Sequence, residues 1–148
     1  MDNQYFYSTE IEWTKERQGN LCSPVLPCLH VDAPPEFKGH DGAWTPEHLF
    51  VGAVNSCFMT TFLAIAENSK LDFVSFKTAA DGKLEKLDGG FQMTEIILHP
   101  TLTIAHARDA ERASRILEKA EKHCLISNSI KTTVHLQPEI DIVEQAAS

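Results

Sequence analysis

The chain has few basic side chains for its acidic content. Its 148 residues include 13 Lys and Arg against 21 Asp and Glu, which gives a formal net charge of −8 at pH 7. Nucleic acids bind to concentrated positive surfaces, because their phosphates need cationic partners. The composition therefore argues against a nucleic-acid partner, and a hydrophobic fraction of 43% is typical of a soluble globular protein.

The first residues also lack the pattern of a secretory leader. Met1 to Gln4 contain no basic region followed by an apolar stretch, so we expect a cytoplasmic protein. Because the cytosol is reducing, the four cysteines of the chain are better interpreted as thiols than as structural disulfides. Cys22, Cys28 and the histidines near them match none of the common spacings of structural zinc sites, so we expect no metal ion.

Long hydrophobic runs are scarce, and only residues 46–66 are long and apolar enough to resemble a transmembrane helix. This segment contains polar residues such as Glu47 and Asn55, and it lacks a flanking cluster of Lys or Arg. A central helix that is buried by its own protein on nearly all sides explains the pattern better. We therefore expect no membrane partner.

The order of elements predicts a single α+β domain over residues 1–148. Thr45 as N-cap and Pro46 at the first helical position begin the apolar helix, which should run to about Asn68. A second, amphipathic helix is expected over residues 107–124, where apolar residues recur at spacings of three and four. Strands are expected at residues 5–13, 21–23, 28–31, 73–87, 91–104 and 131–136, with turns at 18–20 and 88–90.

A helix that is apolar on all sides needs more cover than these strands and one further helix provide. Gly52, Ser56 and Thr60 fall four apart in it and form a ridge of small residues that lets another helix approach closely. We therefore expect a homodimer, in which the partner covers the exposed side of the helix.

Two cysteines lie in the apolar stripes of these helices, Cys57 in the first and Cys124 at the end of the second. A buried thiol on a core helix is usually a small hydrophobic side chain. Two thiols on helices that pack together can also meet and form a redox pair. Because an apolar interior raises the pKa of a thiol, Cys57 needs a nearby cation to react, and an arginine held by Glu47 would supply it.

Helix geometry separates Glu47 from Cys57, since ten helical residues span about 15 Å. Glu47 can therefore act on the thiol only through a long arginine side chain, a kinked helix or a second subunit. Cys124 lies at a helix C-terminus, where the helix dipole disfavours a thiolate. This difference favours Cys57 as the attacking thiol and Cys124 as the resolving thiol.

The chain resembles the OsmC/Ohr family of thiol-dependent hydroperoxide reductases over residues 9–143. Three segments carry the resemblance, Thr45-Pro46-Glu47-His48-Leu49-Phe50, Ser56-Cys57-Phe58 and Cys124-Leu125-Ile126-Ser127-Asn128. The resemblance implies an intertwined homodimer in which antiparallel sheets wrap a long central helix and a second amphipathic helix. It also implies active sites at the subunit interface.

The resemblance assigns roles to four residues. It implies that Cys57 is the peroxidatic cysteine, that Cys124 resolves it, and that Glu47 holds an arginine, which Arg17 matches by position. The implied antioxidant reaction reduces alkyl or lipid hydroperoxides to alcohols through a Cys57 sulfenic acid and a Cys57–Cys124 disulfide, which an external dithiol reduces. No cofactor is needed, and Cys22 and Cys28 lie outside the family pattern.

Four aromatic residues near these motifs are candidates for the walls of an apolar substrate pocket. They are Phe37, Trp44, Phe50 and Phe58. Two other functions fit the same dimer pocket and the same thiols. One is a non-catalytic protein that binds a small acyl or aromatic ligand, and the other is a redox sensor whose disulfide alters a partner interaction.

Overall fold

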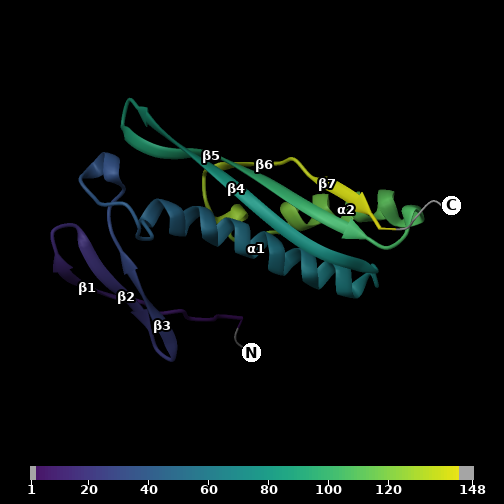
Figure 1. The fold of residues 1–148 in the computed structure, drawn as a ribbon, viewed down its shortest axis with the longest axis horizontal. Coiled ribbons are helices and arrows are strands. Elements are labelled where there is room, and N and C mark those ends of the chain that lie inside the picture. Colours follow the sequence, from purple (N-terminus) through teal and green to yellow (C-terminus); the bar gives the residue numbers. More distant parts are fainter. Residues whose placement is uncertain (1–2, 144–148) are drawn as a thin grey trace. The chain divides into compact units, whose positions relative to one another are not determined.

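The computed structural model describes residues 3–143, which belong to two compact units (Figure 1). The first unit comprises Met1–Phe50 and the second Val51–Ser148. The described residues contain a three-stranded sheet, a four-stranded sheet and two α-helices, so the predicted α+β class is confirmed.

The first unit is built on an antiparallel sheet of consecutive hairpins. Its strands are β1 (Glu10–Lys15), β2 (Gln18–Ser23) and β3 (Leu26–Val31), in that spatial order. The predicted first strand began too early, because residues 5–9 are not paired in a sheet.

The predicted turn at residues 18–20 is wrong, because the chain turns at Glu16 and Arg17 instead. Glu16 has a φ of 52°, in the left-handed region that tight turns require. Gly19 belongs to β2, where an added Cβ would lie 2.8 Å from the Glu12 carbonyl oxygen. The glycine that suggested a turn therefore permits close packing within the sheet.

Strand alternation gives this sheet one apolar face and one polar face. The pairs Ile11–Leu21–Leu29 and Glu12–Asn20–His30 fix the register across all three strands. The apolar face carries Ile11, Trp13, Leu21, Leu29 and Val31. The polar face carries Glu10, Glu12, Asn20, Cys22, Cys28 and His30.

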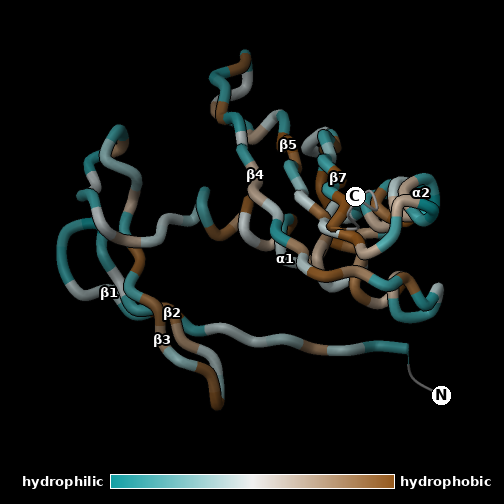
Figure 2. Tube along the Cα trace, turned by 45° about the vertical axis from the view of Figure 1, so that its right-hand side comes forward, coloured by the Kyte–Doolittle hydropathy of each residue, from teal (hydrophilic) through white to brown (hydrophobic). Residues whose placement is uncertain are grey.

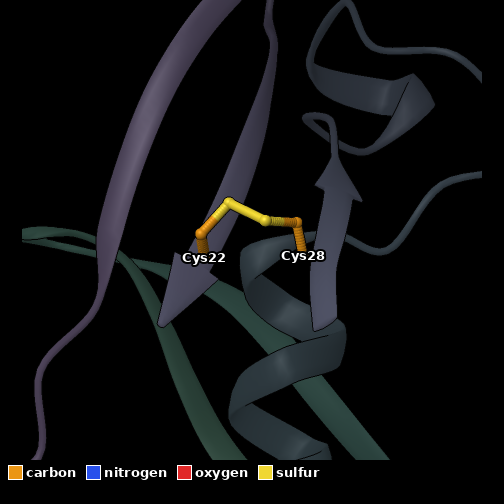
Figure 3. Close-up of a disulfide and its surroundings, with 2 residues drawn as sticks. All are labelled: Cys22 and Cys28. Atoms are coloured by element: carbon orange, nitrogen blue, oxygen red, sulfur yellow. A yellow bond between two sulfur atoms is a disulfide. The ribbon is translucent and has the colours of Figure 1, made fainter. Parts of the chain in front are cut away.

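Cys22 and Cys28 form a disulfide across strands β2 and β3 (Figure 3). The expectation that all four cysteines are thiols is therefore wrong, and Cys57 and Cys124 are the two free cysteines. The strand pairing explains the bond, because it holds the two Cα atoms 4.3 Å apart. Cysteines that close are within the range that a disulfide can bridge.

A buried carboxylate closes the loop that follows β3. Asp32 is 3% exposed, and it accepts the Ala33 N–H at 2.7 Å and the His40 N–H at 3.0 Å. Burial alone raises the pKa of Asp32, but its hydrogen bonds to His40 and Ala33 outweigh that effect and hold the pKa below its ordinary value. Gly39 is required here, because an added Cβ would overlap the Ala33 carbonyl group.

Helix α1 (Pro46–Asn68) begins where the sequence predicts. The His48 N–H donates to Thr45 Oγ1 at 3.1 Å, which confirms the Thr45 N-cap. By length and composition α1 could cross a membrane, and it is the one helix of residues 3–143 that could. Only one face of α1 is buried, and it carries Val54, Phe58, Phe62 and Ala66 at four-residue spacing. A single chain therefore covers this helix on fewer sides than the sequence analysis predicted.

The second unit contains a four-stranded sheet. Strands β4 (Phe73–Leu87) and β5 (Gly90–Ile104) form a long hairpin whose turn, Asp88 and Gly89, lies where it is predicted. Strands β6 (Thr133–Leu136) and β7 (Glu139–Ile142) pair in parallel with the other edge of β5. The sequence analysis missed β7, because two of its four residues, Glu139 and Asp141, are of acidic types that are uncommon in strands.

One face of this sheet forms the core. Ile96, Leu98, Leu102 and Ile104 of β5 are completely buried. The face is covered by α1 and by α2 (Ala110–Lys122), which buries Ala113, Ile116, Leu117 and Ala120 (Figure 1). The outer face of α2 is polar, and Figure 2 colours much of this helix as hydrophilic.

Aromatic packing fixes α1 on β4. The Phe62 ring stacks on Phe76 with centroids 4.5 Å apart and meets Phe73 edge-on at 5.4 Å. Two residues from Cys57, the Asn55 amide donates to the Thr78 carbonyl at 3.0 Å and accepts the Thr78 hydroxyl at 3.0 Å. These contacts set both the height and the rotation of the helix over the sheet.

We predict that Phe62→Ala lowers the free energy of unfolding by about 3–5 kcal/mol, because it leaves a cavity between α1 and β4. Urea denaturation followed by circular dichroism measures the change. The same truncation at Phe6, which is 86% exposed, serves as the control and should stay within about 0.5 kcal/mol. Equal effects at both positions would contradict this description of the core.

Candidate active site

The second unit brings Cys57 and Cys124 into contact. Cys57 lies in the middle of α1 and is half-buried, and Cys124 is completely buried just after the end of α2. The thiol of Cys124 is within hydrogen-bonding reach of the Cys57 sulfur. The meeting of two thiols that the sequence suggested is therefore present in the fold.

Cys57 is surrounded by hydrogen-bond donors. Burial by itself raises the pKa of Cys57, but donors from Ile126 N–H, the Cys124 thiol, Thr61 and Leu125 N–H outweigh it and hold the pKa below its ordinary value. Thr61 Oγ1 lies one helical turn further along α1, at 3.9 Å from Cys57 Sγ. Donors aimed at a sulfur favour the thiolate over the thiol.

The environment of Cys124 acts in the opposite direction. Burial raises the pKa of Cys124, and the adjacent Cys57 sulfur raises it further, while the Ser127 hydroxyl and backbone N–H only partly offset the rise. Apart from this interaction, the buried Ser127 Oγ has no hydrogen-bond partner among residues 3–143. Of the two thiols, Cys57 is therefore the one that loses its proton first as the pH rises.

A short turn after α2 supplies most of the donors. The Asn128 N–H donates to the Cys124 carbonyl at 3.1 Å, and Ser129 N–H donates to the Ile126 carbonyl at 2.9 Å. This turn leaves the N–H groups of Leu125 and Ile126 directed at the Cys57 sulfur. Helix α2 ends at Lys122, two residues before the predicted end at Cys124, so the Leu125 and Ile126 N–H groups lie beyond the helix and stay available to the sulfur.

The sequence analysis looked for a cation beside Cys57 and missed these neutral donors. Thr61 was detectable, because residues four apart on a helix are neighbours. The two backbone N–H groups were not, since any residue type carries them and only the tertiary structure aims them.

The other two predicted catalytic residues belong to the first unit. Arg17 is exposed in the turn between β1 and β2, and it lines an apolar cavity of about 420 Å³. The remaining lining residues are Ile11, Trp13, Gln18, Gly19, Val31, Asp32, Ala33 and Pro46. Glu47 lies in the first turn of α1, and its Oε1 is buried without a hydrogen-bond partner among the described residues.

The four aromatic candidates for a pocket occupy different settings. Phe58 is completely buried and packs on Phe76 with ring centroids 6.1 Å apart, so it belongs to the core. Trp44 is 52% exposed and meets His48 edge-on. Phe37 and Phe50 are half-buried. Across residues 3–143, no cluster of three or more His, Cys, Asp or Glu is arranged to hold a metal ion.

We predict that Thr61→Val raises the pKa of Cys57 and slows its alkylation at pH 7 by about twofold to fourfold, because a donor to the thiolate is lost. Iodoacetamide rates measured across pH give the pKa. Since folding depresses this pKa, the thiolate stabilises the fold at alkaline pH, and that contribution is lost as the pH falls through the folded-state value.

Thr60→Val is the matched control for this experiment. The Thr60 hydroxyl donates to the Cys57 carbonyl at 3.1 Å and is exposed, so it leaves the sulfur untouched. An unchanged pKa in Thr61→Val, or the same rise in Thr60→Val, would contradict the assignment.

Comparison with known proteins identifies relatives over the whole chain. The family model described as OsmC-like protein matches residues 39–139. The uncharacterized protein YmaD of Bacillus subtilis is 28% identical over 147 residues, which cover 96% of this chain and 97% of YmaD. Peroxiredoxin OsmC of Escherichia coli is 29% identical over 104 residues, or 70% of this chain and 71% of that protein.

Solved structures share the fold. An OsmC-like protein of unknown function from Vibrio cholerae superposes with a TM-score of 0.83 at 22% identity, covering 91% of this chain and 99% of the other. An organic hydroperoxide resistance protein from Elizabethkingia anophelis gives a TM-score of 0.75 at 23% identity, covering 96% and 99%. The match of the family model over more than half of the sequence leads to one conclusion: this chain belongs to the OsmC-like protein family.

Proposed function

We propose that this protein is a cytoplasmic thiol peroxidase that reduces organic hydroperoxides to alcohols. The observation that carries the proposal is the contact between Cys57 and Cys124, in which the pKa of the first thiol is lowered and that of the second is raised. A peroxidatic cysteine must be a thiolate, and a resolving cysteine must be close enough to capture its product. The similarity to proteins named peroxiredoxin and organic hydroperoxide resistance protein points to the same chemistry.

The first step is attack on the peroxide. The Cys57 thiolate attacks the distal oxygen of the hydroperoxide, the O–O bond breaks, and the alkoxide takes a proton and leaves as the alcohol. Cys57 is thereby oxidised to a sulfenic acid, and the peroxide is reduced by two electrons. The backbone N–H groups of Leu125 and Ile126 hold the thiolate in place before the attack.

The second step uses Cys124. Its sulfur attacks the Cys57 sulfenic acid, a disulfide forms, and the sulfenic oxygen leaves as water. An external dithiol then exchanges with this disulfide and restores both thiols. The initial hydrogen-bonded contact means that little movement is needed before the disulfide forms.

Arg17 and Glu47 complete the proposed site. A buried carboxylate oxygen without a partner is costly, and a guanidinium group is the side chain best suited to satisfy it. We assign that role to Arg17, which also orients the peroxide oxygens. The apolar cavity beside Arg17 would accept the alkyl part of an organic hydroperoxide and would disfavour hydrogen peroxide.

The protein is proposed to act as a homodimer. On α1, Met59 and Leu63 are 37% and 39% exposed, and they lie beside the small residues Ser56 and Thr60, which are also exposed. An apolar helix face with a ridge of small residues is suited to close packing against a second copy. Active sites at that interface would combine residues from both chains.

We predict that the reduced protein consumes cumene hydroperoxide faster than hydrogen peroxide under a dithiol reductant. Cys57→Ser should abolish consumption, because it removes the nucleophile. Cys124→Ser should permit one turnover and then stop, with a sulfenic acid that a dimedone probe captures. If the wild type consumes neither peroxide, the peroxidase proposal fails. Disulfide formation without turnover would indicate a redox sensor instead.

We predict that Arg17→Lys lowers kcat/KM for cumene hydroperoxide by about tenfold to a hundredfold, since a guanidinium that orients two oxygens is replaced by a point charge. Glu47→Gln should lower it similarly, because it releases the arginine. Arg115→Lys on the exposed face of α2 is the control and should leave the rate unchanged. A normal rate in Arg17→Lys would remove this residue from the mechanism.

A further inference from the structure

The Cys22–Cys28 disulfide is not used by the proposed peroxidase reaction, and its short loop limits what it adds to the stability of the fold. It joins neighbouring strands that backbone pairs already hold at Leu21–Leu29 and Ser23–Leu26. The bond closes a loop with a sequence separation of only 6 residues. A disulfide stabilises mainly by restricting the unfolded chain, and this effect is smallest for short loops.

Features other than the bond also hold the hairpin. Pro24 fixes its own φ in the turn between β2 and β3, whereas Val25 has a φ of 59°, which is strained for a β-branched residue. Pro27 precedes Cys28 on β3, which is an edge strand of the sheet, and an edge strand tolerates the missing N–H of proline. The backbone pairs Leu21–Leu29 and Ser23–Leu26 should therefore keep the two cysteines opposite each other after reduction.

The disulfide is open to attack from solvent. Cys28 is exposed and Cys22 is half-buried. Both border a surface cavity of about 330 Å³ on the polar face of the sheet, together with Glu10, Ile11, Glu12 and Asn20. Figure 3 shows the bond bridging the two strands at this face. A small thiol can therefore reach the sulfur atoms without unfolding the hairpin.

We propose that Cys22 and Cys28 form a second thiol–disulfide exchange site, whose substrate is an uncharged dithiol. One thiolate of the dithiol attacks Cys28 Sγ, the Cys22–Cys28 bond breaks, and Cys22 leaves as a thiolate that takes up a proton. The second thiol of the substrate attacks the mixed disulfide and releases Cys28. Two electrons pass to the protein, and the substrate leaves as its own cyclic disulfide.

The geometry selects dithiols over monothiols. After the first attack Cys22 remains beside the mixed disulfide, at a high effective concentration, and it expels a monothiol by re-forming the original bond. A dithiol carries its own second thiol and competes with this return reaction. The pairing of β2 and β3, which keeps Cys22 beside the mixed disulfide, therefore favours dithiol over monothiol substrates.

Charge is a second source of selectivity among thiol substrates. Glu10 pairs directly opposite Cys22, and Glu12 pairs with Asn20 on the same face. His30, opposite Asn20 on β3, is the nearest titratable group of the third strand on this face. The two carboxylates repel any incoming thiolate, and they repel a thiol that carries further negative charge more strongly. In the reducing compartment expected for this chain, disulfides are usually transient and catalytic or redox-sensing, which agrees with such a site.

The experiment uses the folded Cys57→Ser/Cys124→Ser variant, in which Cys22 and Cys28 are the only cysteines, so its outcome is independent of the proposed peroxidase function. The variant is treated with dithiothreitol or with reduced glutathione at equal thiol concentration, alkylated, and weighed by mass spectrometry. We expect dithiothreitol to open the disulfide at least about tenfold faster than glutathione. The far-ultraviolet circular dichroism should stay unchanged, and oxidised dithiothreitol should restore the bond.

Resistance of the disulfide to dithiothreitol until urea unfolds the protein would overturn the proposal, as would loss of sheet signal on reduction. Should the double variant fail to fold, peptide mapping of alkylated wild-type protein gives the same readout for Cys22 and Cys28 separately from the other pair.

The charge selectivity is tested with Glu10→Gln/Glu12→Gln. We expect glutathione to open the disulfide about threefold to tenfold faster in this variant, with a smaller acceleration for dithiothreitol, whose attacking thiolate carries no further charge. Glu36→Gln/Glu139→Gln removes the same charge from exposed positions that do not line the cavity and should leave both rates unchanged. Equal acceleration in the two variants would assign the effect to net charge and overturn the proposed charge selectivity.

Discussion

The second unit depends on the packing of α1 against the buried face of its four-stranded sheet. Phe62 stacks on Phe76, and the reciprocal hydrogen bonds between Asn55 and Thr78 fix the helix in rotation as well as in height. Cys57 is two residues from Asn55, so the position of its sulfur follows from that contact. Because α2 covers the same face, the turn after α2 delivers Cys124 and its neighbouring N–H groups to the Cys57 sulfur.

The thiol pair shows how a fold can acidify a cysteine without a cation in contact with it. Burial works against the thiolate at both positions, and the difference between them arises from hydrogen bonds. Cys57 receives donors from a turn and from Thr61, whereas for Cys124 the adjacent Cys57 sulfur adds to the effect of burial. A displacement of the turn at residues 125–126 would therefore remove donors and raise the pKa of Cys57.

The two cysteine pairs occupy contrasting surroundings. Cys57 and Cys124 come from distant parts of the sequence, and their contact joins a half-buried thiol to a completely buried one, so their encounter needs the whole second unit. Cys22 and Cys28 are close in sequence and lie on one hairpin, so their pairing needs only two strands. With Cys28 exposed, the second pair is the more accessible to thiols in solution.

Local chemistry made the α+β class, the N-cap of α1 at Thr45, the long hairpin and the interest of Cys57 and Cys124 predictable from the sequence. These features follow from a side chain that caps a helix, a glycine turn, or an apolar period over many residues. The prediction failed at the turn of the first hairpin, because Gly19 serves close strand packing there, and at β7, whose Glu139 and Asp141 are of types uncommon in strands.

The folded chain was needed to show that the Leu125 and Ile126 N–H groups acidify Cys57, that Phe58 lies in the core, and that Cys22 bonds to Cys28. Those features depend on which segments meet in space and on the direction of backbone N–H groups, and every residue type except proline carries the same N–H group.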